Sequence, residues 1–388
     1  MKFGGSSVAT VEKLLDVADK VVRARRRGHG VVVVVSAMGK TTDELVALAR
    51  KVAPDPPRRE LDMLVSTGER VSMALLSIAI SARGEDAISF TGSQSGIITN
   101  DRHFDARIIE VRPHRIEDEL ARGRIVIVAG YQGMSYKREI TTLGRGGSDT
   151  TAVALAAALG AERCEIYSDV DGVYSADPRV VPEAVHLPEI DLAAVQEMAE
   201  AGAKVLNAQA VEWARRAKIA IYARRTADPE DERGGVARET VAREGAVVRA
   251  RAVVGLKGVV AARFPRALLP EFVARDLPLV DLAMTGDVAT GHIPLLNVPD
   301  WSERRRGLAR PGVVLEEGRG IVSVVGDDLM PGGASRLEDT LRTANIPCAA
   351  VFAGPLRVAG VVAESDVDRA QRALHDALVR DRPAPQSP

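Results

Sequence analysis

The stretch TTLGRGGSDTTA, residues 141–152, combines an arginine, a serine and an aspartate with glycines. Glycines leave room for a ligand to approach the backbone closely. Arg145 carries a forked guanidinium that suits a carboxylate or a phosphate. A helix is expected from about Thr150, capped by Ser148 or Asp149, and its free N–H groups would favour an anion. The same pattern also fits an ordinary loop before a capped helix, so this stretch alone leaves both interpretations open.

Three further loops carry groups that could hold a substrate. KFGGSS, residues 2–7, places Lys2 and glycines before a helix, which suits an oligophosphate, although it does not match the P-loop pattern. SAMGKTT, residues 36–42, offers N–H and hydroxyl donors after a strand. The acids of YSDVDGVYSADPR, residues 167–179, could bind ribose hydroxyls or a metal, or could simply cap a turn.

Strands and helices alternate along the first 225 residues and must position these loops. Continuous apolar runs predict strands at 30–39, 125–133, 164–169 and 218–224. Helical patterns lie between them at 8–27, 58–83 and 150–159. The alternation predicts an α/β sandwich with a mainly parallel sheet. Ligands of such folds collect beyond the carboxyl ends of the strands. We therefore expect one shared site for the loops KFGGSS, SAMGKTT, TGSQSG (91–96) and TTLGRGGSDT.

Composition limits the classes of function. A chain of 388 residues suggests two or three domains, and its formal net charge of −1 gives no electrostatic case for binding nucleic acid or a membrane. No run is expected to span a bilayer and the N-terminus does not resemble a signal peptide, so the cytoplasm is the expected compartment. Cys164 and Cys348 lie in apolar runs and are expected to be reduced thiols.

Taken in order, the motifs resemble those of the aspartokinases, which are amino-acid kinases. They are KFGGSS, SAMGKTTDEL, STGERVSMALL, SFTGSQSG, VAGYQG, TTLGRGGSDTTAVALAAALGA, EIYSDVDGVYSADPR and GAKVL. The resemblance covers residues 1–225 and implies a three-layer amino-acid kinase catalytic domain. It implies transfer of the γ-phosphoryl group of Mg-ATP to the side-chain carboxylate of L-aspartate, giving 4-phospho-L-aspartate.

The same resemblance implies a role for each matching residue. Lys2 is expected to neutralise the transferring phosphoryl group, with Asp149 between it and the substrate. Arg145 is expected to clamp the substrate carboxylate and Glu69 to pair with its ammonium. The rest of the aspartate pocket is expected from Ser36, Thr42, Tyr131 and Ser148. Nucleotide binding is expected from Lys2, Gly4, Gly5, Ser168, Asp169, Tyr174, Arg179, Lys204 and Val205. Gly4 and Gly5 would donate N–H hydrogen bonds to the ATP phosphates. Mg²⁺ would be coordinated mainly by those phosphates.

Plainer interpretations exist for three of these residues. Glu69 could merely pair with Arg70, Tyr131 could be a core aromatic residue, and Lys204 could be a solvated lysine at a helix start. The N-terminus also departs from the family pattern, in which a short apolar strand precedes the lysine. Here Met1 precedes Lys2 directly, so we expect either an unanchored Lys2 or a start upstream of Met1.

The C-terminal part resembles the two ACT modules of aspartokinases, small βαββαβ units that bind lysine or threonine as inhibitors. Residues 226–250, with DPEDERGG, are expected to be a linker, 251–315 a degenerate first module, 316–381 a second module and 382–388 a disordered tail. In the first module ARFPRA replaces an acid-plus-glycine turn and PDWSERRRGLARPG lacks a clear pairing pattern. FAGPLRV replaces a polar segment in the second.

These replacements predict a kinase without lysine or threonine control, because an amino-acid effector needs partners for both of its charges. Paired ACT-like sheets would still favour a homodimer or larger assembly. Two alternatives remain: a kinase for a related amino or carboxylic acid, and a pseudokinase that serves in assembly. Arg145 and Glu69 favour an α-amino acid substrate, and Lys2 and Asp149 argue against a pseudokinase.

Overall fold

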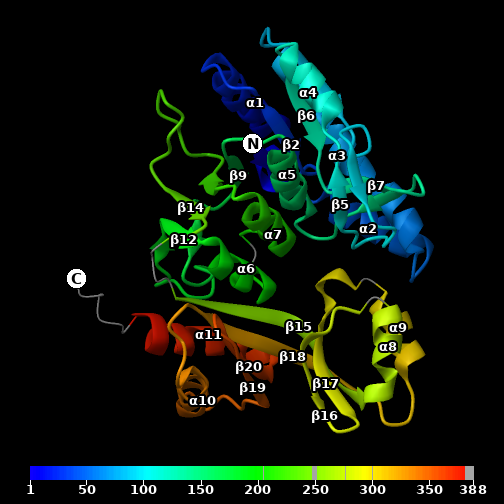
Figure 1. Ribbon diagram of the computed structural model, residues 1–388, viewed down its shortest axis with the longest axis vertical. Coiled ribbons are helices and arrows are strands. Elements are labelled where there is room, and N and C mark those ends of the chain that lie inside the picture. The colour runs from blue at the N-terminus through cyan, green and yellow to red at the C-terminus, as the bar shows by residue number, and fades with distance from the viewer. Residues whose placement is uncertain (204, 247–250, 276, 299, 381–388) are drawn as a thin grey trace. The chain divides into compact units, whose positions relative to one another are not determined.

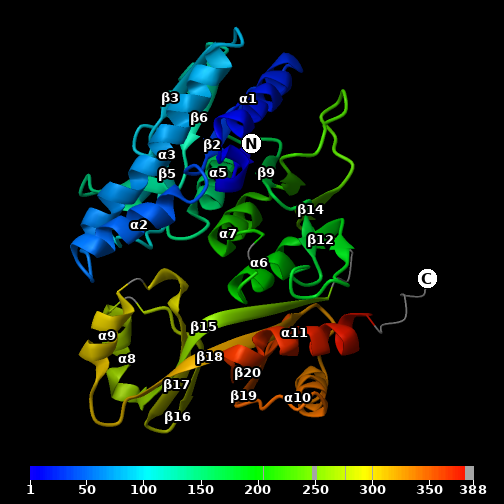
Figure 2. The same ribbon diagram turned by 180° about the vertical axis from the view of Figure 1, so that it is seen from behind.

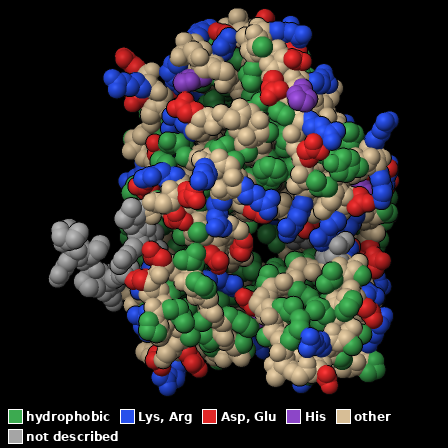
Figure 3. Space-filling model, in the orientation of Figure 1, with side chains coloured by type: hydrophobic (Ala, Val, Ile, Leu, Met, Phe, Trp, Pro, Cys, Tyr) green, Lys and Arg blue, Asp and Glu red, His purple; other side chains and the backbone are tan. Residues whose placement is uncertain are grey.

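The computed structural model describes residues 1–203, 205–246, 251–275, 277–298 and 300–380. They form two compact units, each described by itself. Unit 1 comprises Met1–Val173, Pro188–Gln196 and Val205–Val247, and unit 2 comprises Tyr174–Leu187, Glu197–Lys204 and Val248–Pro388. On the face drawn in Figure 3, basic and acidic side chains are interspersed with hydrophobic ones.

The described part of unit 1 is built on an eight-stranded, mainly parallel sheet in the order β12-β14-β13-β9-β1-β2-β6-β3 (Figure 1). Its strands are β1 (Lys2–Phe3), β2 (Val32–Val35), β3 (Ala87–Phe90), β6 (Ile125–Ala129), β9 (Cys164–Ser168), β12 (Glu189–Asp191), β13 (Ile221–Arg225) and β14 (Glu239–Arg243). The β-branched residues of β2 and β6 are buried, as expected for central strands covered on both faces. The predicted α/β class with a mainly parallel sheet is confirmed.

Helices cover both faces of this sheet, which makes three layers (Figures 1 and 2). α1 (Val11–Arg26) and α3 (Arg58–Ser81) share one core with β1, β2 and β6. α5 (Gly147–Ala158) and α4 (His114–Ala121) lie on the opposite face, and α7 (Ala208–Ala217) packs against α5. α2 (Thr41–Val52) packs against α3. η1 (Gly5–Val8) follows β1 in unit 1. The elements near the unit boundaries are β10 (Val173–Tyr174), β11 (His186–Leu187) and α6 (Leu192–Glu200).

Helix α3 meets the length and hydropathy expected of a membrane span, contrary to the sequence-based expectation that no run would. Half of its most apolar window is buried inside the protein. Leu76 and Ile80 pack in the core shared with α1 and the sheet. This burial identifies α3 as a core helix.

A smaller sheet of unit 1 carries the arginine loop. It has the order β5-β4-β7-β8 and consists of β4 (Ile97–Thr99), β5 (Ile108–Val111), β7 (Gln132–Ser135) and β8 (Ile140–Thr142). β8 runs directly into residues 143–146 and then into α5. The smaller sheet was not predicted, because its strands are short.

The expected linker is largely part of unit 1. β14 pairs antiparallel with β13, so residues 239–243 belong to the main sheet. In the preceding loop, the carboxylate of Glu230 is almost fully buried and pairs with Lys20 and Arg27 of the α1 region. Glu230 thus forms buried ion pairs, whereas Asp231, Glu232 and Arg233 of the same segment are exposed. Composition alone does not distinguish these two situations.

Unit 2 contains a sheet of order β16-β17-β15-β18-β20-β19. Its strands are β15 (Ala252–Pro265), β16 (Val280–Thr285), β17 (Val288–Pro294), β18 (Val314–Val325), β19 (Ala350–Ala353) and β20 (Arg357–Ala363). Its helices are η2 (Arg266–Leu268), α8 (Leu269–Ala274), η3 (Leu295–Asn297), α9 (Trp301–Leu308), α10 (Gly333–Thr343), η4 (Glu364–Asp366), α11 (Val367–His375) and the π-helical turn η5 (Asp376–Arg380).

Two long antiparallel strands run through both of the regions that were expected to form separate modules. The second half of β15 pairs with β17, whereas the second half of β18 pairs with β20. The β15–β18 pairing covers both regions and has an irregular register between Leu256 and Ala261. Separate hydrophobic cores lie under α8 and α9 and under α10 and α11. The expected boundary at 315/316 therefore falls inside a strand that both modules use.

The first module is more complete than its sequence suggested. PDWSERRRGLARPG contains α9, whose Leu308 is buried in the same core as Phe272 of α8. Where an acid-plus-glycine turn was expected, Phe264 stacks on Phe272 with ring centroids 3.9 Å apart. The module thus keeps its helices through apolar packing. The expected disordered tail, 382–388, lies outside the described residues.

Candidate active site

Neighbouring parallel strands bring the expected loops to one edge of the main sheet. β1 lies between β2 and β9, with Lys2 opposite Val34 and Ile166, and β6 continues the parallel set. The loops that follow these strands begin at residues 4, 36, 130 and 169, and TGSQSG follows the parallel strand β3. The loops KFGGSS, SAMGKTT and TGSQSG thus lie at the carboxyl edge of the main sheet, whereas TTLGRGGSDT follows β8 of the smaller sheet.

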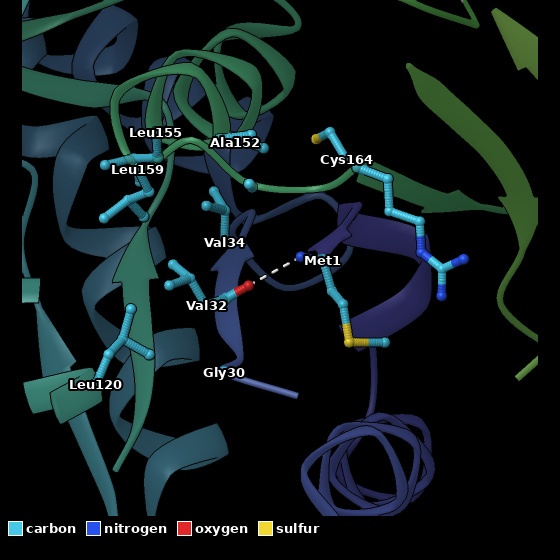
Figure 4. A pocket seen from close by; sticks show the side chains of 12 residues that line it. Met1, Gly30, Val32, Val34, Leu120, Ala152, Leu155, Leu159 and Cys164 are labelled. Atoms are coloured by element: carbon cyan, nitrogen blue, oxygen red, sulfur yellow. Dashed lines mark hydrogen bonds between the residues drawn. The ribbon is translucent and has the colours of Figure 1, made fainter. Parts of the chain in front are cut away.

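Lys2 is firmly anchored in the sheet. The Met1 amino group donates a hydrogen bond of 2.8 Å to the carbonyl of Val32 (Figure 4). A cavity of about 180 Å³ adjoins Met1, lined mainly by apolar side chains such as Leu155 and by Cys164. It lies where β2 and β9 begin, at the opposite end of the strands from the loops above. The expectation of an unanchored Lys2 is wrong because backbone pairing on both sides holds β1.

The Lys2 ammonium and the Asp149 carboxylate form the charged centre of the site. Nζ of Lys2 lies 2.7 Å from Oδ1 of Asp149, and both residues are less than 10% exposed. Asp149 stands in the first turn of α5, where the helix dipole favours an anion. This helix begins at Gly147, not near Thr150 as expected, because the left-handed Gly146 precedes it. Ser148 and Asp149 are therefore first-turn residues rather than caps.

The two glycines after Lys2 make room for its ammonium and for the next loop. A Cβ at Gly4 would lie 3.4 Å from Nζ of Lys2, and one at Gly5 would lie 2.9 Å from the carbonyl oxygen of Ala37. The Gly4 N–H donates to the carbonyl of Tyr167 at 3.1 Å. It is therefore already paired, which differs from the expectation that it faces the phosphates.

Glu69 is a buried carboxylate whose hydrogen bonding is incomplete. It lies on α3 and is 2% exposed. Its Oε1 accepts a hydrogen bond of 3.0 Å from the Ala37 N–H, and its Oε2 has no hydrogen-bond partner among the described residues. Burial raises the pKa of Glu69 to about 7. A buried oxygen without a donor is a ready acceptor for a substrate ammonium.

Arg145 projects from a tight turn in the loop between β8 and α5. Gly144 and Gly146 on either side have φ angles of +73° and +75°, a conformation that glycine adopts readily. The guanidinium is about two-thirds exposed, and one of its nitrogens lies 3.4 Å from a carboxylate oxygen of Asp43. Arg145 is thus a cation on an exposed loop that leads into the helix carrying Asp149.

The other expected pocket residues lie on the converging loops. Ser36 follows β2 and Thr42 stands in the first turn of α2, both half-buried. Tyr131 follows β6 with φ of +67°, and burial raises the pKa of its hydroxyl. Ser148 packs so closely that a Cβ at Gly130 would lie 2.6 Å from its Oγ.

The expected nucleotide residues fall in both units. Ser168 ends β9, Asp169 is exposed in the next loop, and Val205 is half-buried; all three belong to unit 1. Tyr174 and Arg179 belong to unit 2. There Tyr174 contacts His186 edge to face, and Arg179 makes a two-point hydrogen-bonded pair with Asp177. Lys204 lies outside the described residues.

Two groups near this edge were missed by sequence reasoning. Thr226, assigned to the linker, hydrogen-bonds through Oγ1 to Ser7 at 2.6 Å and to the Ser168 carbonyl. Asp62, fully buried on α3, accepts hydrogen bonds from the Thr142 hydroxyl and the Phe104 N–H. Asp62 lies seven residues before Glu69, about two helical turns, and this spacing was an available signal.

Among the described residues, no group of three or more His, Cys, Asp and Glu side chains is arranged to hold a metal ion. Asp149 is already paired with Lys2 of the phosphate-suited loop. We therefore assign no set of protein ligands to a metal.

Comparisons with known proteins agree with the family resemblance given by the motifs. The profile of the amino acid kinase family matches residues 1–224. The aspartokinase of Mycolicibacterium smegmatis is 42% identical over 401 residues, covering 97% of this chain and 95% of that protein. The crystal structure of Escherichia coli aspartokinase III with aspartate and ADP (R-state) matches with a TM-score of 0.82 at 25% identity, covering 97% of this chain and 98% of that chain. The same enzyme with lysine and aspartate (T-state) matches with a TM-score of 0.67 at 26% identity and the same coverage. The chain belongs to the amino acid kinase family and, within it, to the aspartokinases.

Proposed function

We propose that this enzyme transfers the γ-phosphoryl group of ATP to the side-chain carboxylate of L-aspartate. The observation that carries the proposal is the buried Lys2–Asp149 pair at the carboxyl edge of the sheet, with Glu69 on the adjoining helix. The related E. coli enzyme, crystallised with aspartate and ADP, supports the same pair of substrates. Such substrates are available in the cytoplasm, which we propose as the compartment.

The reaction needs charge neutralisation more than proton transfer. A side-chain carboxylate is ionised at neutral pH, so one of its oxygens can attack the γ-phosphorus directly. The bond between that phosphorus and the β–γ bridging oxygen breaks, and ADP leaves with the electron pair. The product is an acyl phosphate. Two anions must approach each other, and the Lys2 ammonium would offset the charge on the transferring group. Asp149 would hold that ammonium in place.

The aspartate pocket would recognise both charges of the amino-acid backbone. Oε2 of Glu69 lacks a hydrogen-bond partner among the described residues and would accept from the substrate ammonium. Arg145 would grip the α-carboxylate with two N–H groups. Ser36, Thr42, Tyr131 and Ser148 would line the space between them, and this requirement for both charges favours an α-amino acid over a simple dicarboxylate.

The nucleotide would be bound by the remaining expected residues. We assign phosphate contacts to Lys2 and Gly5, and assign Gly4 to providing room for the ammonium. Ser168, Asp169, Tyr174, Arg179, Lys204 and Val205 are proposed for the rest of the nucleotide. Mg²⁺ would enter with ATP, coordinated mainly by its phosphates, and would supply further charge neutralisation.

An acceptor panel tests this function. ADP release is followed with saturating Mg-ATP and L-aspartate, L-glutamate, N-acetyl-L-aspartate or succinate. We expect turnover with L-aspartate and at least about tenfold lower kcat/KM with the analogues that lack the ammonium, because Glu69 would then remain unpaired. Turnover on succinate equal to that on aspartate would contradict the pocket assignment. No turnover on any acceptor would contradict the function.

We propose that lysine and threonine do not control this enzyme. An effector can couple to catalysis only by binding two states differently, and binding requires partners for its charges. In the expected first module, Phe264 lies in the ARFPRA segment that replaces the acidic turn and stacks on Phe272 of α8. In the second, Arg357 is engaged by Asp281 in a two-point pair. Titration of both amino acids at subsaturating aspartate should leave the rate unchanged, and inhibition at low millimolar concentration would contradict this proposal.

We also propose assembly through unit 2. β16 is an edge strand of its sheet, and its residues Leu282 and Met284 are 40% and 44% exposed. Exposed apolar edge strands are prone to pair with another chain. Light scattering should therefore give the mass of a dimer or larger assembly, and Met284→Lys should lower it. A monomer at micromolar concentration would contradict the proposal.

A further inference from the structure

We infer that Asn207 is a positioning residue for Arg145, holding the arginine turn in the conformation that grips the substrate. Asn207 precedes α7, more than 60 residues from Arg145 along the chain, directly after the GAKVL motif and outside it. The inference rests on the proposed role of Arg145 as the carboxylate clamp. It adds a residue to the binding machinery that need not touch the substrate itself.

The Asn207 amide joins three segments of unit 1. Its Oδ1 accepts hydrogen bonds from the N–H groups of Gln209 and Ala210 at 2.9 and 3.4 Å, and so caps α7. The same oxygen accepts from the Thr150 hydroxyl of α5 at 3.0 Å. Its Nδ2 donates to the carbonyl oxygen of Arg145 at 2.8 Å. Because donors converge on Oδ1, the nitrogen must face the carbonyl, which fixes the orientation of the amide.

The turn around Arg145 is closely packed against this amide. A Cβ at Gly146 would lie 2.7 Å from Nδ2 of Asn207. Across the turn, the Gly147 N–H donates to the Gly144 carbonyl at 3.1 Å. The Arg145 carbonyl is thus held between two left-handed glycines by a side chain from another helix.

This contact matters because the Arg145 side chain is mostly exposed. About two-thirds of its side-chain surface is open to solvent, and one guanidinium nitrogen donates to Oδ1 of the exposed Asp43 at 3.4 Å. The position of the Arg145 backbone therefore determines where the guanidinium can be placed. A two-point hydrogen-bonded grip on a carboxylate tolerates little misplacement. Without the hydrogen bond from Asn207 to the Arg145 carbonyl, the glycine-flanked turn would sample more conformations. Binding of aspartate would then have to restrict the turn to one of them. We expect the Michaelis constant for aspartate to rise while the ATP site is spared.

Two substitutions separate positioning from helix capping. In Asn207→Ser the hydroxyl can still cap α7 but is too short to reach the Arg145 carbonyl. Asn207→Ala removes both contacts. We expect KM for aspartate to rise about tenfold in both variants, with KM for ATP within twofold of wild type, as expected for one lost hydrogen bond that orders a clamp. The melting temperature should fall only in Asn207→Ala.

A purely structural role predicts another pattern. If KM for aspartate rises only where the melting temperature falls, Asn207 is a helix cap and the inference is wrong. It is also wrong if both variants keep the wild-type KM. Arg145→Ala is the reference variant. If Asn207 acts through Arg145, adding Asn207→Ser to Arg145→Ala should not raise KM for aspartate further. If Arg145→Ala itself leaves KM unchanged, the clamp assignment fails, which separates that outcome from failure of positioning alone.

Discussion

Glu69 allows the sharpest prediction, because its buried carboxylate should give aspartate use a pH dependence near neutrality. Burial raises its pKa to about 7 from an ordinary value of 4.5, and the ionised form is the one that can accept the substrate ammonium. At pH 6 only about one-tenth of the free enzyme would carry the charge, and at pH 8 about nine-tenths. kcat/KM for aspartate should therefore rise nearly tenfold between these values, because that ratio reports the free enzyme.

The assay measures initial rates at saturating Mg-ATP from pH 5.5 to 9. The profile of kcat should be flatter at low pH, since a bound ammonium lowers the pKa of its partner. Glu69→Gln keeps an oxygen for the Ala37 N–H but cannot ionise. It should therefore lose most activity, and its kcat/KM should no longer rise with pH near 7; we call this rise the pH limb. Glu60→Gln, on the exposed start of the same helix, is the matched control and should keep the limb. A flat wild-type profile, or the same limb in Glu69→Gln, would refute the reasoning.

The same pKa makes a stability prediction of defined sign. Between pH 4.5 and about 7 the folded state binds more protons at Glu69 than the unfolded state does, so stability falls as pH rises through this window. The difference between pKa 4.5 and about 7 corresponds to about 3 kcal/mol. Glu69→Gln should therefore be more stable than wild type at pH 8, by up to about 3 kcal/mol, and the gain should vanish near pH 4. Equal stability at both pH values would contradict the burial argument.

Three further predictions concern the charged groups. Lys2→Met should lower kcat about 10²–10³-fold in protein that remains folded, and a smaller loss than tenfold would show that Lys2 does not neutralise the phosphoryl group. It should also lower the melting temperature, because it leaves the buried Asp149 carboxylate without its charged partner. Arg145→Lys should raise KM for aspartate about tenfold, because an ammonium cannot grip a carboxylate at two points, and unchanged kinetics would exclude a clamp. Glu230→Gln should destabilise unit 1 by about 3 kcal/mol in urea unfolding by leaving Lys20 and Arg27 without their charged partner, whereas the exposed control Glu232→Gln should not.

The sequence predicted the parts of the site that depend on strand order. Each buried β-branched run ends in a loop, and parallel neighbours place those loops at one edge. The resemblance to aspartokinases implied that Asp149 lies beside Lys2, because Asp149 follows the smaller sheet and strand order in the main sheet does not place it. The start of α5 was placed too late because Ser148 and Asp149 have the chemistry of caps. The left-handed glycine at 146 ends the loop instead, and a sequence does not show which of two valid starts is used.

Long-range pairing explains what could not be predicted. DPEDERGG has the composition of a linker, yet Glu230 is buried by cations from α1 some 200 residues earlier. The free oxygen of Glu69 depends on which donors lie around it, and Asn207 depends on how α7 meets the arginine turn. Two successive modules were also expected, whereas β15 and β18 pair along both regions. This sharing could not be predicted, because no local sequence pattern shows that one strand serves two modules.

Identification of the phosphorylated product tests the central claim most directly. The full chain is incubated with Mg-ATP and L-aspartate in the presence of hydroxylamine, and the trapped product is analysed by mass spectrometry, with Lys2→Met as the control. The account predicts the hydroxamate of the aspartate side chain in stoichiometric relation to ADP, and its near absence with Lys2→Met. ADP formation without any aspartyl hydroxamate, or equal hydroxamate with Lys2→Met, would contradict it.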